Sequence, residues 1–154
     1  MKLLILSMLS FVVISTTAFS QEATRKAQFN LDKSKVAIQG YDPVAYFVVN
    51  KAIKGSKSFT AFADGVVYYF SSQANKSLFL NNYEKYEPQY GGWCAYAMGA
   101  TNEKVEIDPE TFKIVNGKLY LFYHTWVNNT LTKWNKDEAL LKAKADINWS
   151  ILFK

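Results

Sequence analysis

The sequence predicts an α+β fold: one small single domain in which two β-hairpins form antiparallel sheet, packed with short helices and a helical C-terminal tail. Two observations favour this class. Asp64-Gly65 and Asn116-Gly117 each separate two runs rich in aromatic and β-branched residues, which is typical of hairpins with tight turns. The segments around the hairpins have helical spacing, without the strand–helix alternation of a doubly wound fold.

Residues 1–20 are typical of a secretory signal peptide. Lys2 precedes an apolar run at residues 3–14, which is shorter than the roughly 20 residues of a membrane-spanning helix. Residues 18–20 then have the small-x-small pattern of a cleavage site. We therefore expect cleavage before Gln21, an extracytoplasmic location (periplasmic or secreted), and no transmembrane segment after cleavage.

The rest of the chain is expected to form one domain with a single core. An N-terminal arm is predicted at residues 21–37 and a core unit at residues 38–100. The second hairpin and the C-terminal helices of the same domain follow at residues 101–154. The formal net charge is +5, but the basic residues are scattered rather than grouped in a dense block, so we expect no nucleic-acid binding.

Three elements are predicted in the first half of the chain. Asp42-Pro43 starts a short helix, because the carboxylate can cap the helix and proline suits its first position. Residues 58–70 form the first hairpin. Residues 71–86 form a second helix, which Ser71 or Ser72 caps.

Two elements are predicted in the second half. Residues 111–123 form the second hairpin, with its tip at Asn116-Gly117. The tail from Thr125 to Trp149 has spaced tryptophan and leucine residues, which predict helix.

Three stretches, "GYDPVAYF", "GVVYYFSSQANKSLFL" and "YEKYEPQYGGWCAYAMG", occur in this order and resemble the YHS domain family. The resemblance is closest to its exported, stand-alone members and covers residues 38–99 well. The "IVNGKLYL" hairpin and the helical tail are also similar to that subgroup. The wider family includes short domains attached to heavy-metal pumps, so the resemblance implies a small binding module for a metal ion or a small molecule.

This chain departs from the metal-associated members of that family at two positions. Those members carry one cysteine after Asp-Pro-Val and another after Tyr-Phe, where this chain has Ala45 and Ser71. A methyl group cannot bind a metal, and a neutral hydroxyl is a poor ligand for a soft metal. We therefore do not expect the thiolate-rich zinc or copper site of those relatives here.

Cys94, which follows Gly91-Gly92, is the only cysteine and the first candidate for chemistry. It is interpreted as a thiol packed in the interior, as part of a ligand site, or as a reactive thiol in the first turn of a helix. His124 is the only histidine and a candidate partner of Cys94 in thiol catalysis or metal binding. The alternative for His124 is a strand-end or helix-cap residue.

A pocket lined by tyrosine and tryptophan side chains is the second hypothesis, because their hydroxyl groups and rings can orient a small polar or planar molecule. The alternative is that the rings only enlarge the core. The acidic residues between positions 103 and 110 lack the spacing of a calcium loop, so we expect a solvated loop there. The predicted ligand-binding residues are Cys94, Asp42, Tyr41, Tyr46, Tyr90 and Trp93.

Three functions stay open at this point. The sequence favours an exported YHS-type binding module without enzymatic activity, whose partner is a small ligand or a metal ion cofactor. The alternatives are a Cys94-dependent thiol or redox enzyme, and a protein-interaction accessory without a small-molecule site. We also expect Cys94 to face the interior beneath the Gly91-Gly92 turn, close to residues 42–47.

Overall fold

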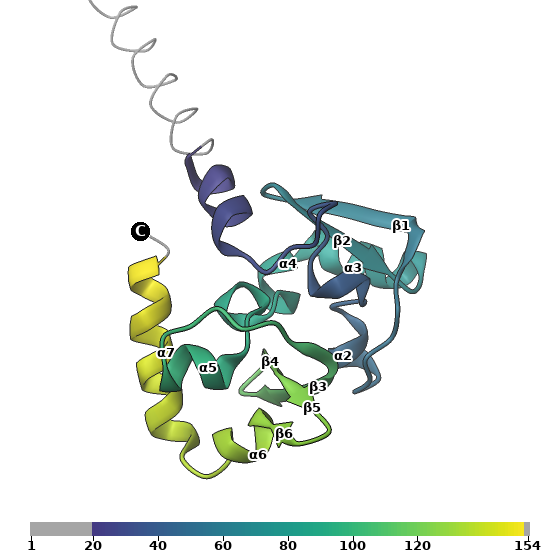
Figure 1. Ribbon diagram of the computed structural model, residues 1–154. Coiled ribbons are helices and arrows are strands. Elements are labelled where there is room, and N and C mark those ends of the chain that lie inside the picture. Colours follow the sequence, from purple (N-terminus) through teal and green to yellow (C-terminus); the bar gives the residue numbers. More distant parts are fainter. Residues whose placement is uncertain (1–19, 153–154) are drawn as a thin grey trace, which may run out of the picture.

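The computed structural model describes residues 20–152 and confirms the predicted α+β class (Figure 1). The predicted signal peptide lies outside the described residues except for Ser20, and residues 20–28 are helical. The helices that follow in the described residues are η1 (Ile38–Gly40), α2 (Ala45–Val48), α3 (Gln73–Asn81), α4 (Tyr83–Tyr86), η2 (Gln89–Gly92), α5 (Ala95–Ala100), α6 (Thr130–Trp134) and α7 (Glu138–Leu152). The strands are β1 (Ser56–Ala63), β2 (Val66–Phe70), β3 (Asp108–Val115), β4 (Lys118–Phe122), β5 (His124–Thr125) and β6 (Asn128–Asn129).

Both predicted hairpins are present, with antiparallel pairing of β1 with β2 and of β3 with β4. Asp64 and Gly65 have φ angles of 43° and 85°, and Asn116 and Gly117 have φ angles of 51° and 71°. Positive φ at both central residues is what a tight type I′ turn requires. The two predicted hairpin tips are therefore confirmed.

The predicted helical tail is wrong over its first residues. Thr125 pairs with Asn128 in a short β5–β6 hairpin, so the helical part begins only at Thr130. The reason is local: the Asn129 side chain accepts a hydrogen bond from the backbone N–H of Leu131 at 3.0 Å and caps α6 there.

The helix predicted over residues 71–86 is divided into α3 and α4. Ser72 is its cap, since its hydroxyl oxygen accepts from the Asn75 backbone N–H at 3.1 Å. Asn82, with φ −162°, interrupts the helix, and its side chain accepts from the Lys85 N–H at 3.3 Å to start the next turn. An extended asparagine that caps a new turn explains why one periodic segment forms two helices.

Two buried clusters form the core. The first includes the fully buried side chains Tyr46, Tyr68 and Phe79, and the second includes Tyr120 and Trp134. The two clusters meet around the segment from α4 to α5, which Figure 1 shows between the first hairpin and α7. This segment therefore joins the two halves of the domain.

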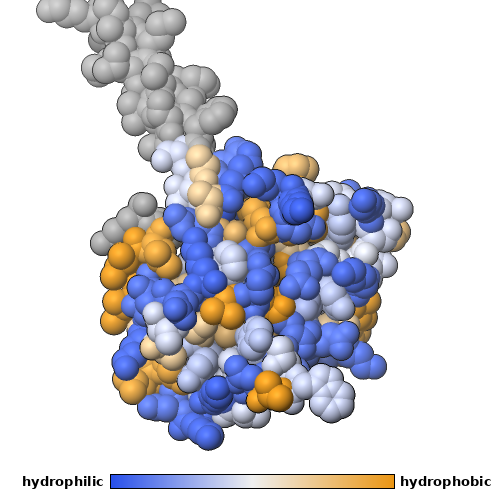
Figure 2. Space-filling view, in the orientation of Figure 1, coloured by the Kyte–Doolittle hydropathy of each residue, from blue (hydrophilic) through white to orange (hydrophobic). Residues whose placement is uncertain are grey.

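Helix α7 packs along α5 with its inner face, and Ala145 is fully buried there. Its outer face exposes Leu140, Ile147 and Ile151, and Figure 2 shows apolar surface on the side where α7 lies. Among the described residues, no helix combines the length and the apolar character that a membrane crossing would need.

Candidate functional site

Cys94 is fully buried and occupies the N-cap position of α5, so the prediction that it faces the interior is confirmed. Its sulfur accepts a hydrogen bond from the Tyr123 backbone N–H at 3.3 Å and lies 3.3 Å from the Thr130 hydroxyl oxygen. The Thr130 hydroxyl donates its single proton to the Tyr123 carbonyl at 2.7 Å. With that proton used, the Cys94 thiol is the donor toward Thr130, so both contacts of the sulfur lie within the core.

The environment of Cys94 bears on whether its thiol is packed or reactive. A reactive thiol needs access for its substrate and an electropositive surrounding. The sulfur is instead buried between neutral groups, in the same cluster as Val44 and Tyr46. Its position favours packing over nucleophilic chemistry.

Asp42 is fully buried, and its carboxylate is surrounded by donors. One oxygen accepts from the backbone N–H groups of Val44 and Ala45 at 2.9 and 3.3 Å, so Asp42 caps α2 as the sequence predicts. The other oxygen accepts from the Ser71 N–H and hydroxyl and from the Asn75 amide, at 2.8, 2.6 and 2.7 Å. Because these bonds tie α2 to α3, the carboxylate has a structural use.

Three of the aromatic residues predicted to bind a ligand instead contact other residues of the protein. The Tyr46 hydroxyl donates to the Pro109 carbonyl at 2.9 Å, and burial raises the pKa of this tyrosine well above its usual value. Trp93 donates from its indole nitrogen to the Gln28 carbonyl at 2.6 Å. Tyr41 lies under the Lys54 ammonium, which is 4.6 Å from its ring centre. A ligand-binding role for these three residues remains a prediction.

His124 lies at the surface in β5, and its ring is held by β3. Its Nδ1 atom is 3.0 Å from the Thr111 hydroxyl and 3.3 Å from the Asp108 carboxylate. The fold brings Cys94 and His124 to neighbouring backbone, because Cys94 binds the N–H of Tyr123. No hydrogen bond joins the two side chains in the part of the chain that the structure describes.

Metal ligands are not gathered at one place within residues 20–152: no group of three or more His, Cys, Asp and Glu side chains there could hold a metal ion. This includes the acidic residues between positions 103 and 110, which form no such group. The loop expected there ends at residue 107, because Asp108 and Glu110 already belong to β3; Asp108 accepts from the Glu110 N–H and the Thr111 hydroxyl, at 3.0 and 2.8 Å, and so stabilises the start of that strand.

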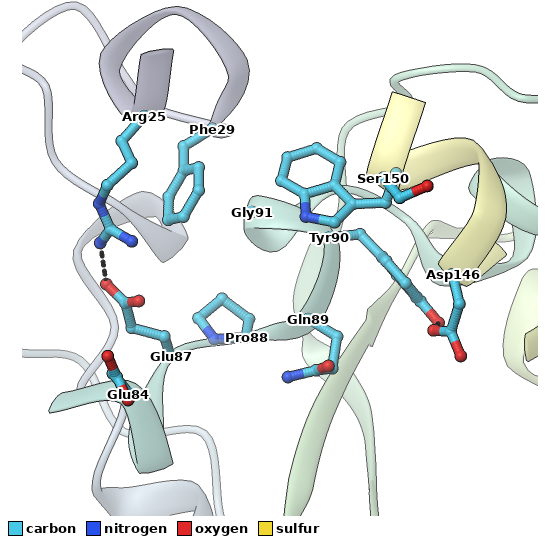
Figure 3. A pocket seen from close by; sticks show the side chains of 11 residues that line it. Arg25, Phe29, Glu84, Glu87, Pro88, Gln89, Tyr90, Gly91, Asp146 and Ser150 are labelled. Carbon is cyan, nitrogen blue, oxygen red and sulfur yellow. Dashed lines mark hydrogen bonds and ion pairs between the residues drawn. The ribbon is translucent and has the colours of Figure 1, made fainter. Parts of the chain in front are cut away.

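A cavity of about 320 Å³ lies elsewhere, between the N-terminal helical segment, the α4–η2 segment and α7 (Figure 3). Its volume falls within the range of small-molecule sites. Of the predicted ligand-binding residues, Tyr90 lines this cavity. The lining residues are Arg25, Phe29, Glu84, Glu87, Pro88, Gln89, Tyr90, Gly91, Asp146, Trp149 and Ser150.

A buried ion pair forms one wall. The Arg25 guanidinium pairs with the Glu87 carboxylate, and both residues are less than a tenth exposed. The Tyr68 hydroxyl donates to the same Glu87 oxygen at 2.6 Å, and Arg25 Nε donates to the Asp64 carbonyl at 3.2 Å. The Arg25 guanidinium also lies 4.5 Å from the Phe29 ring centre. These contacts fix the helical segment 20–28 against the rest of the domain.

The opposite wall comes from η2 and α7. Tyr90 has φ 56°, and this left-handed backbone turns its side chain toward α7. Its hydroxyl donates to the Asp146 carboxylate at 2.9 Å. Burial, and then this hydrogen bond, raise the pKa of Tyr90 far above its usual value, so it stays a neutral donor.

A glycine closes the floor between the two walls. A Cβ atom at Gly91 would lie 2.7 Å from a ring carbon of Trp149 and 2.8 Å from one of Phe29. The φ angle of Gly91 is also positive, at 59°. Only glycine lets the two aromatic rings approach the backbone here.

Sequence reasoning missed most of this cavity. Arg25 and Phe29 lie in the segment predicted as an N-terminal arm, and their four-residue spacing on one helix face was the available signal. The pairing of Arg25 with Glu87 joins residues 62 positions apart, and no local pattern reports it. Trp149 was assigned only to a helical face.

Comparisons with protein-family models, with curated proteins and with solved structures found no match to this chain.

Proposed function

We propose that this chain is an exported YHS-type binding module, and that its ligand is a small organic molecule held in the cavity between residues 20–29, the 84–91 segment and α7. The observation that carries the proposal is the cavity itself. It has aromatic and apolar walls, from Phe29, Pro88 and Trp149, and a few fixed polar groups. That combination is typical of small-ligand sites.

The polar groups are oriented before any ligand arrives. Glu87 and Arg25 are held by each other and by Tyr68, and Tyr90 is held by Asp146. A site whose side chains are already ordered loses less conformational entropy when it binds. This favours a binding function over a surface hollow without a role.

The alternative of a Cys94-dependent enzyme has less support, because the buried thiol donates to Thr130 and does not line the cavity. The residues of the cavity also include no nucleophile beside a histidine. Binding without chemistry is therefore the function that we propose.

A cavity-filling variant tests the proposal. Ser150 lies at the exposed rim of the cavity, and Ser150→Trp would place an indole over the opening. Ala143→Trp is the matched control, because Ala143 is an exposed residue two turns earlier on the same helix and does not line the cavity. Binding of a mixed panel of small cations, neutral molecules and anions is measured by saturation-transfer NMR.

We expect at least one class of the panel to bind the wild-type protein and the Ala143→Trp variant. The same molecules should bind Ser150→Trp about tenfold more weakly or worse, because the added side chain occupies their volume. Binding that persists unchanged in Ser150→Trp would contradict the proposal, and so would a panel without any binder.

A further inference from the structure

The charged groups of the cavity leave an excess of negative charge. Three carboxylates line it, from Glu84, Glu87 and Asp146, against one guanidinium from Arg25. Arg25 is used by Glu87 and by the Asp64 carbonyl, and only 6% of it is exposed. Glu87 and Arg25 therefore neutralise each other, and Arg25 offers little net charge to an incoming anion.

The remaining two carboxylates lie on opposite sides of the cavity, as Figure 3 shows for Glu84 and Asp146. The Glu84 carboxylate forms no hydrogen bond or ion pair with any residue that the structure describes. Asp146 accepts from Tyr90 at 2.9 Å and from the Lys142 ammonium at 2.5 Å. The side chains of the Lys142–Asp146 pair are 37% and 47% exposed, so this pair is a weak one that a ligand can replace.

The apolar walls complement these charges. The rings of Phe29 and Trp149 are 6.0 Å apart, centre to centre, and Trp149 lies one helical turn from Asp146. An organic cation at this place is attracted both by the quadrupole of the aromatic ring and by the negative charge of the carboxylate. An anion of the same shape would meet two carboxylates, while the two cations near them are already paired, Arg25 with Glu87 and Lys142 with Asp146.

We infer that the cavity takes a small organic cation with a flat apolar body, whose charged head binds at the Asp146 carboxylate and whose body lies against Trp149, with Glu84 on the opposite side of the cavity. This inference rests on the proposed binding function and names the chemical class of its ligand.

Three molecules of one shape test the inference: benzamidine is a cation, benzamide is neutral and benzoate is an anion. Their dissociation constants for the full mature protein are measured by titration calorimetry. We expect benzamidine to bind about tenfold more tightly than benzamide, and benzoate to bind least. Equal or tighter binding of benzamide or benzoate would overturn the inference, as would a failure of benzamidine to bind at millimolar concentration.

Two substitutions locate the cationic head. Asp146→Asn should remove most of the preference for benzamidine over benzamide, while Lys142→Met should strengthen benzamidine binding about twofold by freeing Asp146 from its competitor. Asp137→Asn, an exposed acid before the same helix, is the control and should change neither constant. If Asp146→Asn keeps the full preference, the assignment is wrong.

The outcomes separate this inference from the proposed function. If the mixed panel binds in the cavity but only through neutral or anionic members, the binding module stands and the cationic class falls. If Ser150→Trp leaves all binding intact, the site itself is wrong. Folding of each variant is checked by circular dichroism, and the Lys142→Met variant keeps the test decisive if Asp146→Asn does not fold.

Discussion

Replacing Gly99 by alanine tests the packing of α5 against α7. Gly99 lies inside α5, where alanine is the better helix former by about 1 kcal/mol, so propensity alone predicts a more stable protein. The close contact between α5 and α7 instead predicts a less stable protein. A Cβ atom at Gly99 would lie 2.3 Å from the Leu141 carbonyl oxygen and 3.0 Å from its carbonyl carbon.

The size of the effect follows from that contact. Leu141 is a backbone neighbour in α7 and cannot rotate away, so the helices must separate by about 1 Å to reach van der Waals distance. Separation loosens the packing around Ala145 and lengthens the 2.8 Å bond from the Asn148 amide to the Met98 carbonyl. Forced overpacking costs about 1–3 kcal/mol. After the gain in propensity, we expect a net loss of about 1–2 kcal/mol.

Urea unfolding followed by circular dichroism measures the difference. Ala100→Gly serves as the control, because Ala100 is the exposed neighbour in the same helix and reports propensity without the contact. If Gly99→Ala is as stable as the wild type or more stable, the close approach of α5 and α7 is wrong. Since α7 carries Asp146 and Trp149, the variant should also bind cavity ligands more weakly.

Two further predictions concern buried groups. Burial raises the pKa of Tyr46, Tyr68 and Tyr90 in the folded protein above the value of about 10 that a tyrosine has in the unfolded chain. Their contribution to the free energy of unfolding is therefore complete below about pH 10 and is lost as the pH rises above it. The free energy of unfolding should fall above about pH 10, by up to about 1.4 kcal/mol per pH unit for each such tyrosine. The fall should be less steep in the Tyr46→Phe variant. Urea unfolding midpoints that do not change above about pH 10 would refute this prediction. Cys94 should react slowly with iodoacetamide near neutral pH and rapidly in urea, because its sulfur is fully buried, and rapid labelling of the folded protein would restore the thiol-enzyme alternative.

Local patterns predicted the elements whose cause is local. The two hairpin tips follow from Asp64-Gly65 and Asn116-Gly117, since these pairs tolerate the positive φ that the turns need. The cap of α2 by Asp42 is equally local, and so is its place just before proline. The β5–β6 hairpin was missed because its strands are only two residues long, too short for a periodic signal.

The cavity could not be predicted in the same way, because its walls come from both ends of the described chain. Arg25 is an ordinary charged residue in the sequence, and only the distant Glu87 and Tyr68 make it part of a core. The aromatic residues near Cys94 were predicted to share one site with it because they are close to it in the sequence. Adjacent residues on a turn point in different directions, and Tyr90 lines the cavity while Cys94 packs beneath β4 and α6.

The position of the cavity makes it depend on the N-terminal segment. Helical residues 20–28 adjoin the predicted cleavage site before Gln21, and they contribute Arg25 to the wall. Burial of the Arg25–Glu87 pair carries a large desolvation cost, so the pair by itself is weak evidence for net stability. Loss of Arg25 would leave the Glu87 carboxylate buried without its countercharge and release the segment that closes the site. The ion pair therefore links the docking of the N-terminal segment to the formation of the cavity.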